Sequence, residues 1–202
     1  QRIEEGKRLG TFYIWKFAGF NKTGDFIIYD KNGDYKLAAD ATDADRMEVG
    51  NGLPKFTASM THPFRYKGFD LSLYFRGAFG FDIFNIHEFY YGVPDEVGNV
   101  MKIAYTKNEH IKGNPVVCDY FLEKGDYVKL DMVNFGYTFD INRKYIQKAR
   151  LYLTGRNLLT FTKFSGVDPA SYNVNGLTPG ATGSRNWYPA TRQMIFGAQI
   201  DF

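Results

Sequence analysis

Hydrophobic and polar residues alternate along several stretches of this chain. In the last stretch, over 192–202, every second residue from Met194 to Phe202 is apolar, and the residues between them are mostly polar. Successive side chains of a β-strand point to opposite faces, so this pattern predicts a strand with one apolar and one polar face. The same pattern predicts strands over 55–65, 69–79, 127–139 and 150–164.

The alternation changes phase once, inside 127–139. Apolar residues from Val128 to Met132 hold one phase, and those from Val133 to Phe139 hold the other. A β-bulge near Met132 and Val133 would place one extra residue in the strand and explain the change. A strand that is apolar on both faces over part of its length would explain it as well.

The connections between these strands alternate in length. Those at 66–68 and about 140–149 are short, whereas 80–126 and 165–191 are long and rich in Gly, Asn and Tyr. Strands of roughly 10–13 residues suit a tilted membrane crossing, and outer-membrane barrels alternate short periplasmic turns with long external loops. We therefore expect an all-β chain of antiparallel transmembrane strands, with its C-terminus on the periplasmic side. Five or six strands are too few to close a barrel, so the rest must lie elsewhere.

Residues 1–54 follow a different pattern. The stretch 9–20 is apolar on both faces and is compatible with one further strand. The stretch 25–52 is acidic and rich in turn residues, so we interpret 1–54 as an aromatic and acidic extracellular segment. Because Gln1 is neither an initiator Met nor the start of a signal region, we expect a longer encoded protein.

Composition narrows the choice of protein class. The chain is 44% hydrophobic and 18% aromatic, which disfavours a disordered protein. The single Cys118 excludes an internal disulfide framework and a cysteine zinc cage. A net charge of +3 is too small to indicate nucleic-acid binding. No apolar run approaches the roughly 20 residues that a membrane-spanning helix needs.

One acidic stretch resembles the start of a calcium loop. Asp30, Asn32 and Asp34 follow the D-x-N-x-D pattern of oxygen ligands that calcium prefers. The usual turn glycine is replaced by Tyr35, and Ala41 stands where a bidentate glutamate is expected. An acidic surface turn is the alternative interpretation.

Catalytic chemistry is not indicated. His87 and Glu88 begin like a zinc-protease motif, but no second histidine follows four residues later. His62 and His110 are scattered, and neither a nucleophile elbow nor a phosphate-binding glycine loop occurs. We therefore expect no enzyme activity. Apart from calcium at the acidic stretch, the sequence indicates no cofactor.

Aromatic and charged residues are the stronger candidates. Trp187 and Tyr188, just before the last strand, suit a membrane-interface girdle. Tyr90, Tyr91 and Tyr172 lie in the long connections and are candidates for ligand or partner contact, with loop packing as the alternative. Five charged residues fall on the polar phase of their strands and are predicted to face the barrel lumen, or else to form surface ion pairs: Arg65, Asp70, Arg76, Arg150 and Arg156.

Seven stretches, in order, resemble the C-terminal part of a SusC/RagA-type TonB-dependent outer-membrane transporter. They are GTFYIWKFAGF (10–20), DKNGDYKL (30–37), GLPKFTASM (52–60), YKGFDLSLYFRGAFGFDIFN (66–85), GDYVKLDMVNFGYTFD (125–140), ARLYLTGRNLLTFTKFSGVDP (149–169) and YPATRQMIFGAQIDF (188–202).

The resemblance implies that these strands are the C-terminal portion of a large transmembrane β-barrel with long extracellular loops. It implies an N-terminal plug and a TonB box outside this sequence, a SusD-like lipoprotein partner, and uptake of glycans or peptides. The terminal Phe202 suits an assembly signal that is recognised by strand addition. The competing hypothesis is a soluble secreted β-sandwich that binds glycans through exposed aromatic rings.

Overall fold

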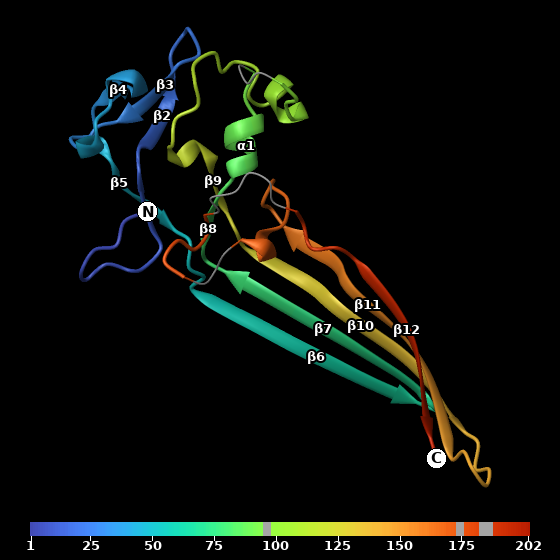
Figure 1. Cartoon of the computed structure of the whole chain (residues 1–202). Coiled ribbons are helices and arrows are strands. Elements are labelled where there is room, and N and C mark those ends of the chain that lie inside the picture. Colours follow the sequence, from blue (N-terminus) through green and yellow to red (C-terminus); the bar gives the residue numbers. More distant parts are fainter. Residues whose placement is uncertain (95–97, 173–175, 182–187) are drawn as a thin grey trace.

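The chain forms a long sheet with a compact group of short elements at one end (Figure 1). The structure is a computed structural model that describes residues 1–94, 98–172, 176–181 and 188–202. Within these residues one sheet has five strands, here called the large sheet. Its strands are β6 (Phe56–Tyr66), β7 (Phe69–Phe79), β10 (Tyr127–Asp140), β11 (Lys148–Thr162) and β12 (Gln193–Asp201).

The large sheet is an open antiparallel sheet in the order β12-β11-β10-β7-β6. Its two edges, β6 and β12, do not pair with each other in the part of the chain that the structure describes. β6 and β7 are joined by Lys67 and Gly68, which both adopt positive φ (44° and 84°). Two consecutive residues with positive φ make a type I′ turn, whose twist matches that of the flanking strands.

The predicted bulge is present in β10. Leu130 and Met132 pair with consecutive residues of β7, so Asp131 is the extra residue in that pairing. The register against β11 shifts at the same place. The bulge therefore lies one position before the predicted one. The extra residue shifts the alternation by one position, so Val128 and Leu130 before the bulge lie on the same face as Val133 and Phe135 after it.

The remaining short elements form what we call the head, built from the described residues of 1–54 and 80–126. Its strands are β1 (Thr11–Ile14), β2 (Lys16–Phe20), β3 (Phe26–Tyr29), β4 (Tyr35–Leu37), β5 (Met47–Asn51), β8 (Asp82–Phe84) and β9 (Leu122–Lys124). Its helices are α1 (Ile86–Tyr91) and the 3₁₀ turns η1 (Ala38–Asp40), η2 (Asp43–Asp45), η3 (Lys102–Tyr105) and η4 (Asp119–Phe121). A further 3₁₀ turn, η5 (Pro169–Ser171), follows β11.

The head differs from the loops that the sequence predicted. The stretch 9–20 is divided between two strands because β1 pairs with β5, whereas β2 pairs with β3. Between the two strands, Trp15 makes an isolated bridge to Cys118. The chain thus changes sheets within a few residues, which explains why 9–20 shows no alternation.

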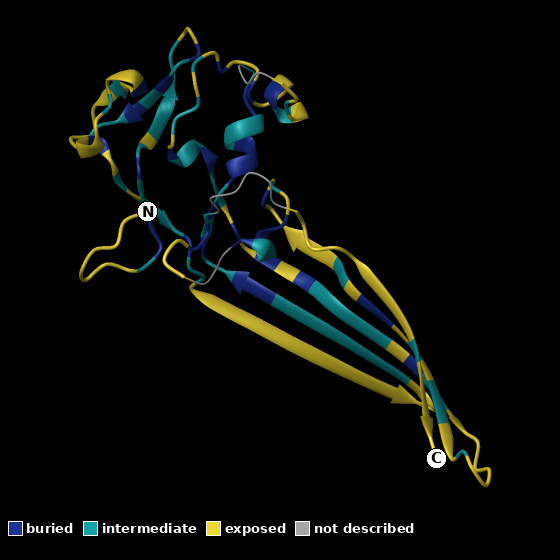
Figure 2. Ribbon diagram, viewed as in Figure 1, coloured by how far each residue is buried: buried dark blue, intermediate teal, exposed yellow. Residues whose placement is uncertain are grey.

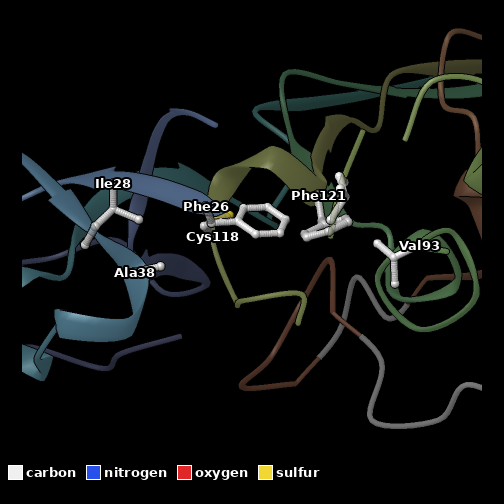
Figure 3. Packing of buried hydrophobic residues seen from close by; sticks show 7 residues of the cluster. Phe26, Ile28, Ala38, Val93, Cys118 and Phe121 are labelled. Carbon is white, nitrogen blue, oxygen red and sulfur yellow. The ribbon is translucent and has the colours of Figure 1, made fainter. Parts of the chain in front are cut away.

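A hydrophobic core joins the two sequence segments of the head. Phe26 and Ile28 from β3 pack with Ala38, Val93, Ile111, Cys118 and Phe121, as the close view of this cluster shows (Figure 3). Aromatic rings surround the core, and Tyr120 and Phe121 meet edge to face at 5.0 Å. The head is therefore a folded unit with an interior of its own. None of the helices in the described part of the chain has the length and apolar character needed to cross a membrane.

Candidate functional site

The two faces of the large sheet differ sharply in chemistry. One face is apolar from β6 to β12, and many of its large side chains are exposed. Figure 2 shows the two edge strands, β6 and β12, almost entirely in the colour of exposed residues. The pairing register brings together on it residues from all five strands: Phe56, Met60, Phe64, Leu71, Leu73, Phe75, Val128, Leu130, Val133, Phe135, Leu153, Leu159, Phe161, Met194, Phe196 and Ile200. An exposed apolar surface of this extent indicates contact with lipid or another apolar partner.

Aromatic rings gather at the hairpin end of this apolar face. Phe69 lies 4.5 Å from Tyr137, and Tyr137 lies 4.6 Å from Phe139, measured between ring centroids. Tyr66 pairs with Phe69 in the register of β6 and β7. Rings at one end of an apolar band are typical of a membrane-interface girdle. This group was not predicted from the sequence, although its members lie close to the predicted hairpin and its neighbouring strand.

The predicted girdle at the other end is only partly described. Trp187 lies outside the described residues, and Tyr188 is 88% exposed. Phe56 and Phe79 stack at 4.9 Å close to that end of β6 and β7. The interfacial role of Tyr188 stays a prediction.

The opposite face carries polar side chains that pair across strands. Asp70 on β7 accepts two hydrogen bonds from Arg150 on β11, at 2.9 Å from Nε and 2.6 Å from Nη2. Arg150 also donates to Asn134, which donates to Thr154 at 2.8 Å. The network crosses β7, β10 and β11, and Gly136 leaves the space it needs, since a Cβ there would lie 2.6 Å from Arg150.

The bulge supports a second ion pair on this polar face. Its extra residue, Asp131, accepts a hydrogen bond from Arg76 Nε at 2.8 Å, and Arg76 Nη1 also contacts the Tyr127 hydroxyl at 3.3 Å. Arg156 pairs with Met132 in the same register. The local break in the ladder therefore positions a carboxylate beside an arginine.

The structure places all five predicted polar-face residues on one side of the sheet. Arg65 and Asp70 line an open cavity of about 590 Å³ at the hairpin end, together with Lys67, Thr138, Arg150 and Gln199. Arg76 and Arg156 lie further along the sheet, outside this cavity. Whether this face points into a barrel lumen stays a prediction.

The predicted calcium residues form a turn between β3 and β4. The Asp30 carboxylate accepts hydrogen bonds from the backbone N–H groups of Asn32 (2.8 Å) and Asp34 (2.9 Å). The hydrogen bond from Asp34 is the main reason that the pKa of Asp30 lies below its usual value. Nowhere in the described parts of the chain do three or more His, Cys, Asp or Glu side chains form a metal-binding group. Calcium binding stays a prediction, which calorimetric titration would test.

The three candidate tyrosines have different surroundings. Tyr90 and Tyr91 are half-buried on α1. Tyr172 is buried, and its ring meets Phe164 edge to face at 5.3 Å. Tyr172 is thus packed in a hydrophobic cluster, and its role in ligand or partner contact stays a prediction.

Polar groups buried in the head were not foreseen from the sequence. Glu88 on α1 is 1% exposed and accepts hydrogen bonds from Lys107 (2.8 Å) and Asn108 (3.1 Å). The Tyr120 hydroxyl donates to Asn108 at 2.5 Å, and burial raises the pKa of Tyr120 to about 12. Burial also raises the pKa of the Cys118 thiol to about 12, so this cysteine is an unreactive core residue.

Sequence comparisons identify the relatives of this chain. TonB-dependent receptor P3 of Formosa agariphila is 28% identical over the whole chain, and TonB-dependent receptor P39 of the same organism is 27% identical over 89% of it. The chain is a homologue of TonB-dependent receptors. It spans only 23% and 19% of the length of these two relatives. No protein-family model matches the chain.

Comparison with solved structures supports the fold of this receptor homologue. The RagAB peptide transporter structure matches 95% of the chain with a TM-score of 0.73 at 21% identity, and the chain spans 23% of that protein. The RagAB peptide importer in the closed-closed state matches with a TM-score of 0.71 at 22% identity. The resemblance to SusC/RagA-type transporters and the all-β barrel fold class are thus confirmed. Among the described residues of this homologue, the strands do not close into a barrel.

Proposed function

We propose that this chain forms part of the wall and external cap of a TonB-dependent outer-membrane importer. The observation that carries the proposal is the large sheet, which has one exposed apolar face and one face of paired polar groups. Outer-membrane barrel strands have this division, with lipid outside and an aqueous lumen inside. The homology to TonB-dependent receptors supports the same function.

The open edges support a place within a larger barrel. β6 is exposed along its whole length, and its outer edge has no neighbouring strand among the described residues. Unpaired backbone groups in lipid cost several kcal/mol each, so both edges need further strands of the same barrel. The order of the seven resembling stretches supports a C-terminal position in that barrel, with the plug and TonB contact supplied by preceding residues.

Connection lengths support an orientation. The turn at Lys67 and Gly68 and the connection 141–147 lie at the end of the sheet where Phe202 stands, and the head lies at the other end (Figure 1). Short turns face the periplasm in outer-membrane barrels. We therefore place the C-terminus in the periplasm and the head outside the cell.

The proposed cargo is a glycan or a peptide too large for passive diffusion, and the proposed partner is a SusD-like lipoprotein over the head. The solved relatives are described as peptide importers, which supports the peptide class without deciding between the two. We propose no enzyme activity for the chain. A soluble glycan-binding β-sandwich is not favoured, because within the described residues no second sheet covers the apolar face.

Removal of Phe202 from the full-length protein tests the assembly role. Phe202 is 82% exposed beyond the end of β12, where it is free to be recognised. We expect a severalfold lower amount of folded barrel in the outer membrane, measured as the band that changes mobility on heating before electrophoresis. Replacement of the neighbouring Asp201 by Asn is the matched control and should leave assembly unchanged. Normal assembly without Phe202 would contradict this role.

Uptake tests the importer itself. Cells that express the full-length protein should take up a labelled member of a panel of glycans and peptides, and this uptake should stop when TonB is deleted. Uptake that persists without TonB would contradict the proposal. A protein that is extracted in soluble form without detergent would contradict the membrane assignment.

A further inference from the structure

The segment that follows β11 folds back onto the polar face of the large sheet. We call residues 163–172 the strap. In Figure 1 its turn η5, drawn in orange, lies against the head end of β10. Phe164, Pro169 and Tyr172 of the strap are buried. This part of the long connection 165–191 is therefore packed against the rest of the molecule.

A buried ion pair holds the middle of the strap. Lys129 Nζ lies 3.2 Å from Asp168 Oδ2, and the two side chains are only 1% and 8% exposed. Asp168 also accepts hydrogen bonds from Ala170 N (3.0 Å) and Ser171 Oγ (3.1 Å), which close the turn η5. Lys129 pairs in register with Arg76 and therefore belongs to the polar face.

Two further contacts hold the ends of the strap. The Ser165 hydroxyl donates to Glu123 Oε1 at 2.7 Å, and its backbone N–H donates to Glu123 Oε2 at 2.8 Å. Glu123 also accepts a hydrogen bond from Asn85, the N-cap of α1. At the other end, Tyr172 packs with Phe164 in a cluster that includes Ala78 and Phe81. The strap is thus joined to the head and to the sheet at once.

We propose that the strap is a fixed element of the passage wall and that Lys129 is the residue that positions it. This rests on the proposed function, in which the polar face lines the passage. The strap covers the ammonium group of Lys129 on the polar face. Removal of one partner of a buried ion pair leaves the other charge buried without compensation, which strongly destabilises the packed arrangement of the strap.

Cysteine labelling of the full-length protein in outer membranes tests this proposal without measuring transport. Ala170 is partly buried in the strap, and Ala170→Cys provides the reporter for a membrane-impermeant maleimide added outside. The native Cys118 of this chain is fully buried and should not react. We expect slow labelling in the parent and labelling that is about tenfold faster or more in Lys129→Met.

A second-site change separates positioning from general disruption. In Lys129→Met, adding Asp168→Asn removes the uncompensated charge, so labelling should slow again towards the parent rate. A merely structural loss of the lysine side chain would not be rescued in this way. Lys124→Met is the matched control, because Lys124 is 77% exposed in its pair with Asp82 and its loss should leave labelling unchanged.

Any one of three results would overturn the proposal. The first is a reporter in the parent that labels as fast as Lys31→Cys at an exposed position. The second is labelling of Lys129→Met that is no faster than in the parent, and the third is a double variant that Asp168→Asn fails to slow. If Lys129→Met does not assemble into a heat-modifiable barrel, Asp168→Asn alone serves, since it leaves the lysine charge buried and should also speed labelling. Failure of uptake with normal labelling would count against the importer function and not against the strap.

Discussion

The large sheet and the head contain the same kinds of apolar residues but use them in opposite ways. In the head, Phe26, Ile28 and Phe121 are almost completely buried against one another. In the sheet, Phe64 and Phe196 are 54% and 72% exposed, although they lie in regular strands. The head therefore buries its apolar surface within the chain, whereas the sheet leaves that surface for an environment outside the chain.

This contrast shows where the stability of each region originates. Burial of apolar side chains in its core stabilises the folded head in water, as it does in a soluble domain. The sheet has a polar network on one face and no covering layer on the other within the described residues, so it depends on lipid and on the rest of the barrel. Mutations should accordingly separate the two regions.

The largest effect is expected from Phe121→Ala in the core of the head. Truncation of a fully buried phenylalanine costs about 3–5 kcal/mol, and Phe121 is 0% exposed. Hydrogen exchange of the full-length protein in detergent should show protection lost from peptides within 80–126 and retained in β10 and β11. Val117→Ala, at an exposed position of the head, should change little. Equal loss of protection in the sheet would show that the two regions do not fold separately.

Substitutions of two adjacent residues of β6 should have a smaller effect on stability. They test the two faces of the sheet more directly. Met60 lies on the apolar face and Thr61 on the polar face, and both are exposed. Arginine on the lipid side of a barrel costs about 2–4 kcal/mol near the middle of the bilayer, whereas lumen positions tolerate charge. Met60→Arg should therefore reduce the heat-modifiable barrel in outer membranes much more than Thr61→Arg does. Equal reductions would mean that the apolar face does not contact lipid.

The sheet could be predicted from the sequence because every strand residue faces one of two different environments. Alternation over 69–79 gave the bounds of β7, and the phase change in 127–139 indicated the bulge within one position. The sequence did not show why the bulge exists. Asp131 pairs with Arg76, which is 55 residues away in sequence, and no local pattern reveals such a partner.

The head and the strap could not be predicted in this way, for a physical reason. Strands of three to five residues, such as β1, β2 and β4, are too short to show a period, and the change of sheets at Trp15 removes what pattern remains. The buried pair of Lys129 and Asp168 joins residues 39 positions apart. Tyr172 lies in a long connection, where no local pattern shows that packing in three dimensions buries it.

The smallest expected effect is a local dependence on acid in the head, at the carboxylate of Asp45. The Asp45 carboxylate accepts hydrogen bonds from Thr42 N (2.8 Å) and Lys36 Nζ (2.9 Å), and the pKa of Asp45 is lowered to about 2, chiefly by the Thr42 backbone N–H. Because the folded pKa lies below the usual value of 3.8, the stabilisation is complete above about pH 4 and is lost as the pH falls towards 2.

Hydrogen exchange, corrected for its intrinsic dependence on pH, should therefore show 36–46 opening between pH 4 and 2 before β10 does. Asp45→Asn should open this segment already at neutral pH and abolish its dependence on acid, whereas Asp40→Asn, at an exposed carboxylate in η1, should keep the native behaviour. If 36–46 and β10 lose protection together, the head does not respond to acid on its own. The separation between a water-exposed head and a lipid-supported sheet would then have to be abandoned for this part of the chain.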